Sequence, residues 1–179
     1  RERRSMTEAE LTKLLQVARW RPLAEYGRRT VAKDATEVKG KRDTWTYAPL
    51  TFDDLSTAVE HARERLAKRP DVIDKLDQLG RERELIYKML LLTGLRKGEL
   101  SSLTLGQLYL DEANPHAELK AADEKNRHGS LIAIRSDLAD DLRQWLDDKA
   151  ERGTSEAGQR GNVLALRRTQ ALPAHTPLF

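Results

Sequence analysis

The sequence contains no cysteine, and only 5% of its 179 residues are aromatic. The lack of cysteine excludes disulfides, thiolate metal sites and cysteine nucleophiles. No apolar run is long enough to span a membrane, and no signal peptide is visible, so we expect a cytoplasmic protein. The four histidines show no metal-ligand spacing, so we expect neither a metal nor a cofactor.

Charged residues are abundant, at 34% of the chain, beside 39% apolar residues. This composition is typical of a helix-rich protein with a highly charged surface. The net charge of +3 is too small to indicate nucleic-acid binding by itself, because the clustering of charge matters more. The length is sufficient for one domain with its own core.

Apolar residues recur at helical spacing in several stretches, which predicts a mostly helical α+β fold. A Thr7/Glu10 capping box opens the first helix, and Pro22 is expected to end it. Asp71 is expected to cap a short helix that Gly80 ends, and Ser136 to cap the last clear helix. The predicted helices span residues 8–20, 52–68, 72–79, 81–93 and 137–149.

Two segments have strand character. Residues 117–122 and 130–134 are joined by a polar turn with a glycine, which predicts a small antiparallel sheet containing this hairpin. Residues 23–50 form a basic excursion with a short strand pair near residues 30–31 and 44–47. This excursion is interpreted as a solvated surface loop, with a DNA-facing basic loop as the alternative. Trp20, Trp45 and Trp145 are expected in the core or at its boundary.

A glycine corner follows the most apolar helix of the chain. Gly94 can take the left-handed conformation that ends a helix, and Leu95 is expected to anchor the turn in the core. Arg96 is then expected in the first turn of the next helix, where backbone N–H groups attract anions. Glu99 lies three residues later on the same face and can hold the guanidinium. The alternative is a corner whose arginine is merely solvated.

The residues of this corner are Thr93-Gly94-Leu95-Arg96-x-Gly98-Glu99-Leu100-x-x-Leu103. They resemble the first conserved box of the tyrosine recombinase (phage integrase) family. The resemblance implies the core fold of a DNA breaking-rejoining enzyme, which cleaves and rejoins double-stranded DNA through a 3′-phosphotyrosine intermediate. It also implies that Arg96 contacts the scissile phosphate.

The polar turn also resembles this family, in the hairpin that carries the catalytic lysine. By this resemblance Lys125 is the general acid, and Lys120 is a weaker alternative because it precedes the turn. An ammonium group at a mobile tip could protonate the 5′ alkoxide that leaves when the phosphodiester breaks. The remaining residues to which the resemblance assigns DNA contacts are Lys97, Asn126, Arg127 and His128.

Two further elements of the family are absent from these 179 residues. No histidine is followed by arginine at the third place, and every tyrosine precedes the hairpin. We therefore expect residues 1–149 to be the N-terminal part of an integrase catalytic domain, with a basic insertion at about 23–50. Residues 150–179 are expected to be a linker and the start of the missing C-terminal half.

The resemblance leaves two functions open. The first is a fragment of a site-specific recombinase for DNA integration, inactive and monomeric alone, from a nucleoid-associated enzyme that forms a tetramer on DNA. The second is a non-catalytic DNA-binding or regulatory module on the same scaffold. A helix–turn–helix regulator is a distant third. A His-x-x-Arg box and a tyrosine after residue 179 would favour the first.

Overall fold

The computed structural model describes residues 5–34, 36–40, 43–123, 128–158 and 172–179. It confirms an α+β fold that is mostly helical and contains small antiparallel sheets, two of them in the part described. The chain divides into two compact units, Arg1–Tyr87 and Lys88–Phe179. None of the described helices is both long enough and apolar enough to cross a membrane.

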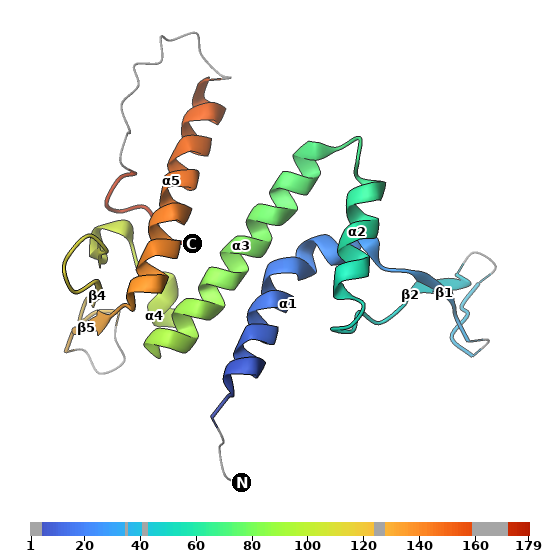
Figure 1. The fold of residues 1–179 in the computed structure, drawn as a ribbon, viewed down its shortest axis with the longest axis horizontal. Coiled ribbons are helices and arrows are strands. Elements are labelled where there is room, and N and C mark those ends of the chain that lie inside the picture. The colour runs from blue at the N-terminus through green and yellow to red at the C-terminus, as the bar shows by residue number, and fades with distance from the viewer. Residues whose placement is uncertain (1–4, 35, 41–42, 124–127, 159–171) are drawn as a thin grey trace. The chain divides into compact units, whose positions relative to one another are not determined.

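The first unit contains α1 (Glu8–Gly27), α2 (Leu55–Arg65) and most of α3 (Pro70–Thr93). The predicted capping box begins α1, because the Thr7 hydroxyl accepts from the Glu10 N–H and the Glu10 carboxylate accepts from the Thr7 N–H. Helices α1 and α2 lie side by side (Figure 1). Their contact is a small apolar cluster built on Ala24, Leu55 and Ala58.

The first helix does not end before Pro22, as the sequence predicted, but continues through it to Gly27. A proline inside a helix removes one hydrogen bond and costs about 3 kcal/mol. The residues that follow it are Leu23 and Ala24, and both are buried. Burying this extra turn against α2 is the physical reason why the helix continues, since each buried apolar side chain offsets part of the cost.

The predicted helix end at Gly80 was also wrong, because α3 runs uninterrupted from Pro70 to Thr93. Gly80 is buried, and a Cβ added there would lie 1.9 Å from the Arg19 carbonyl oxygen of α1. Arg19 in turn donates to the Asp77 carbonyl of α3 at 2.7 Å. The glycine therefore allows two helix backbones to approach closely and does not mark a helix end.

The basic excursion contains the predicted strand pair, as β1 (Thr30–Ala32) and β2 (Trp45–Tyr47). The two strands pair antiparallel and form a two-stranded ribbon, in which Thr30 is opposite Tyr47 and Ala32 is opposite Trp45. All six residues of the two strands are exposed. Trp45 was therefore wrongly expected in the core, whereas Trp145 is buried and Trp20 half-buried as predicted.

The second unit continues from the end of α3 into α4 (Lys97–Ser102) and a short 3-10 helix, η1 (Leu105–Gln107). A three-stranded antiparallel sheet follows, in the order β3 (Leu108–Tyr109), β4 (His116–Leu119) and β5 (Ser130–Ala133). Strands β4 and β5 form the predicted hairpin. The fully buried leucines of this unit are Leu103, Leu138, Leu142 and Leu178.

Helix α5 (Ser136–Gly158) includes Ser136 as its first residue, so Ser136 is not the residue before the helix as predicted, and the helix extends past residue 149 into a stretch predicted to be a linker. The final described residues pack on the same unit. The Leu105 N–H donates to the Thr176 carbonyl at 3.0 Å, and the Leu178 N–H donates to the Leu103 carbonyl at 3.1 Å. Residues 172–179, which contain a turn, are thus joined to the segment that follows α4 by backbone hydrogen bonds and one isolated β-bridge, Thr104 to Pro177.

Candidate functional site

The corner between α3 and α4 has the predicted backbone. Gly94 has φ of 72°, a conformation that glycine adopts without steric cost, and Leu95 beside it is buried. Helix α4 begins at Lys97, so Arg96 is the N-cap with an extended backbone (φ −76°, ψ 153°). The sequence analysis expected Arg96 within the first turn of the helix, but it lies one position before that turn. An N-cap residue is only half within the helix, and its side chain stands beside the first free N–H groups.

Glu99 holds Arg96 at two points. Its Oε2 accepts from the Arg96 backbone N–H at 2.8 Å, and its Oε1 accepts from the Arg96 Nη1 at 3.0 Å. The Glu99 residue is only 8% exposed, whereas the Arg96 side chain is 59% exposed. The carboxylate therefore braces the guanidinium from the protein side and leaves much of it open to solvent.

A cation in this arrangement can bind an oxyanion. The planar guanidinium can offer two donors to a phosphate, and a helix N-terminus adds partial positive charge beside it. Lys97, the first residue of α4, is exposed and increases the local positive charge.

The hairpin residues assigned by resemblance are described only in part. Lys120 is exposed in the turn just after β4, where its carbonyl accepts from the Asp123 N–H. Lys125, Asn126 and Arg127 lie outside the described residues. His128 is exposed, and Gly129 after it has φ of 75° and leads the chain into β5.

An ion-pair cluster within the same unit joins the end of α3 to α5, with a part-buried lysine and two aspartates that are 45% exposed. Lys88 Nζ lies 2.5 Å from Asp141 Oδ2 and 3.3 Å from Asp137 Oδ2. Burial acts to lower the pKa of Lys88, but hydrogen bonds and charge from the two aspartates outweigh it and raise that pKa. For Asp137, burial acts to raise the pKa, yet Arg135 and Lys88 lower it. This cluster satisfies its own charges, which favours a structural role.

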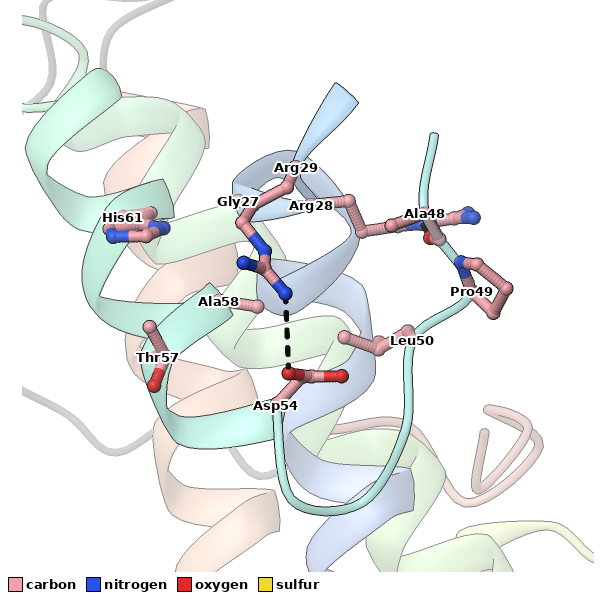
Figure 2. A pocket seen from close by; sticks show the side chains of 10 residues that line it. All are labelled: Gly27, Arg28, Arg29, Ala48, Pro49, Leu50, Asp54, Thr57, Ala58 and His61. Atoms are coloured by element: carbon pink, nitrogen blue, oxygen red, sulfur yellow. Dashed lines mark hydrogen bonds and ion pairs between the residues drawn. The ribbon is translucent and has the colours of Figure 1, made fainter. Parts of the chain in front are cut away.

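The first unit contains a pocket of about 320 Å³ that the sequence did not indicate. Figure 2 shows Thr57 and His61 of α2 on one side and the segment 48–50 on the other. Arg29 extends across it toward Asp54, and the closest atoms of this pair are 3.9 Å apart. The only available signal was the basic character of residues 23–50, which does not show where a cavity forms.

No group of three or more metal-ligand side chains occurs among the residues that the structure describes. Comparisons with models of protein families, with curated proteins and with solved structures found no match to this chain.

Proposed function

We propose that the chain is a DNA-binding fragment of a tyrosine recombinase, an enzyme that breaks and rejoins double-stranded DNA. The observation that carries this proposal is the Arg96–Glu99 pair at the N-terminus of α4. A largely buried carboxylate holds an exposed guanidinium in one orientation, immediately after a glycine turn. The guanidinium is thus oriented from the protein side and 59% exposed on the other, which is what binding an oxyanion requires.

In the proposed reaction, Arg96 binds the non-bridging oxygens of the scissile phosphate. A tyrosine supplied from outside these 179 residues gives up its phenolic proton to solvent as its oxygen attacks the phosphorus, and the bond to the 5′ oxygen breaks. Lys125 gives its proton to that oxygen, so a 5′ hydroxyl and a 3′-phosphotyrosine result. Arg96 stabilises the extra negative charge of the transition state, and Glu99 positions Arg96. The active assembly would be a tetramer on DNA.

A duplex with a nick near the recombination site tests this proposal, because cleavage releases a short strand and leaves the protein covalently attached. The full-length protein should form a covalent protein–DNA adduct of this kind, and an Arg96→Ala variant should not. An unchanged adduct yield from the variant would exclude the proposed role of Arg96. A complete lack of adduct from the unmodified protein, with duplex binding retained, would favour the second function below.

The second candidate is a non-catalytic DNA-binding or regulatory module on the same scaffold. The tyrosines that are present favour this candidate, because none of them lies after the hairpin, where a nucleophile is expected. They are Tyr26, Tyr47, Tyr87 and Tyr109. Such a module would bind backbone phosphates through Arg96 and Lys97 without cutting. The reading frame beyond residue 179 distinguishes the two functions. A His-x-x-Arg box and a later tyrosine would support the enzyme, and their absence would support the module.

A further inference from the structure

The two-stranded ribbon β1–β2 presents two aromatic side chains on one face. Trp45 and Tyr47 are two residues apart on β2, so they point to the same side, about 7 Å apart along the strand. They are 63% and 57% exposed. Their cross-strand partners, Ala32 and Thr30, are too small to cover the rings. The pair therefore contributes little to any core of the first unit.

Positive charge is concentrated in the same part of the chain. Residues 28–47, which include the ribbon, contain six lysines and arginines and three acidic residues, a net charge of +3, which equals that of the whole chain. The other residues together are neutral. Arg28 and Lys33 are ion-paired, with Glu25 and Asp43 respectively. A surface of this kind complements a polyanion, and its pairing with exposed aromatic rings is typical of proteins that bind unpaired nucleotides.

We propose that the ribbon and its basic flanks bind single-stranded nucleic acid, with bases stacked on Trp45 and Tyr47. A protein partner could also use aromatic residues, but the local charge favours a nucleic acid. A duplex keeps its bases stacked on each other, so their faces are not open to the two rings. This binding surface is separate from the Arg96 corner and does not depend on the function proposed above.

The ribbon is held in place from its base by arginines. Arg28 donates to the Ala48 carbonyl at 2.8 Å, and its guanidinium lies 5.4 Å from the centre of the Tyr47 ring. Arg65 of α2 donates to the Tyr26 and Arg28 carbonyls at 2.9 and 3.2 Å. These contacts order the ring platform before any ligand binds, which reduces the entropy lost on binding.

Arg29 is placed to contact the backbone of the same strand. Its side chain is 73% exposed, and its ion pair with Asp54 is long, at 3.9 Å, so a phosphate can compete for it. It lines the pocket at the base of the ribbon, with His61 facing it across the cavity (Figure 2). A phosphate in this pocket would belong to the nucleotide next along the strand to the one stacked on Tyr47.

Fluorescence anisotropy of the 179-residue chain with a labelled 15-nucleotide oligothymidine tests the proposal. Trp45→Ala and Tyr47→Ala should each weaken binding by about 5- to 150-fold, the range for one lost base–aromatic stack. Tyr87→Ala is the matched control, because Tyr87 is also an exposed aromatic but lies on α3, and it should leave the affinity unchanged. Far-UV circular dichroism should show that each variant is folded.

The salt dependence supplies a second, independent readout. Arg29→Ala should reduce the slope of log affinity against log salt by about 0.7, the value for one phosphate contact to a single strand. Arg83→Ala, which removes an exposed arginine of α3 that belongs to neither proposed site, should leave the slope and the single-strand affinity unchanged. Equal affinity of the two aromatic variants and the unmodified chain would overturn the proposal. Absence of single-strand binding, or a preference for a duplex of the same length, would also overturn it.

Discussion

At the scale of single residues, Glu99 has two tasks that the geometry allows to be separated. Its Oε2 caps the backbone N–H at the start of α4, and its Oε1 holds the Arg96 side chain. The first contact supports the helix, and the second would support binding of a phosphate. The Arg96 side chain, in contrast, is mostly exposed, so it does not contribute to the core.

Substitution of Glu99 should distinguish these tasks. Glu99→Gln retains an oxygen that can accept the Arg96 N–H but removes the charge, so we expect a loss of less than about 1 kcal/mol in the free energy of unfolding. Glu99→Ala removes both contacts and should cost about 1 to 2 kcal/mol. Urea denaturation of the 179-residue chain measures both. Equal stability of the two variants would show that the cap contributes nothing.

The spacing of three residues between Arg96 and Glu99 is local, so the sequence was able to predict their contact. The exposure of Trp45 was not predictable in this way, because it depends on which segments pack over the ribbon. Two aromatic residues at alternate positions within a basic stretch were the available signal. Lys125 was assigned by resemblance and lies outside the described residues, so its role stays a prediction.

At the scale of elements, helix ends were the least predictable feature. Pro22 and Gly80 are residues that usually end helices, yet both lie inside one, because buried contacts with a neighbouring helix outweigh the local preference. Local preference did decide the outcome at Gly94, where the backbone φ is positive. The difference lies in long-range packing, which a single sequence does not display.

A matched pair of glycine substitutions tests this interpretation. Gly80→Ala should destabilise the chain by about 2 kcal/mol or more, because the new Cβ meets the Arg19 carbonyl of α1 at 1.9 Å. Gly98→Ala in α4 meets no atom within 4 Å and should be neutral or stabilising by up to about 1 kcal/mol. Thermal unfolding followed by circular dichroism compares them. A neutral Gly80→Ala would refute the close approach of α1 and α3.

At the scale of the whole molecule, ion pairs make stability depend on pH. Hydrogen bonds and charge from arginine or lysine lower the pKa values of Glu25, Asp43 and Asp71, and Arg135 and Lys88 do so for Asp137. A carboxyl with a lowered folded-state pKa contributes stability above its unfolded value of about 4, and this is lost as the pH falls through the folded value. We expect the free energy of unfolding to decrease below about pH 4, as measured by urea denaturation across pH.

Lys88 allows this dependence to be examined at one cluster. Lys88→Met leaves Asp137 and Asp141 without their shared cation and should cost less than about 1 kcal/mol near pH 7, because both aspartates are 45% exposed and Asp137 keeps its pair with Arg135. The difference from the unmodified chain should shrink below about pH 4, where the aspartates become neutral. The difference should also shrink at high pH, where Lys88 loses its proton. Because the pKa of Lys88 is raised, this loss occurs at a higher pH than for an ordinary lysine. A difference that is constant with pH would show that packing, not charge, is responsible.

The central claim is that Arg96 binds the scissile phosphate, and it is tested most directly by measuring cleavage rate and DNA affinity on the same full-length preparation. Arg96→Ala should reduce the single-turnover cleavage rate about 100- to 1000-fold, as for loss of one transition-state donor. The affinity for the duplex site should change much less, because many separate phosphate contacts supply it. Arg83→Ala, which removes an exposed arginine of α3, should leave the rate unchanged. Cleavage by Arg96→Ala at close to the parental rate would contradict the account.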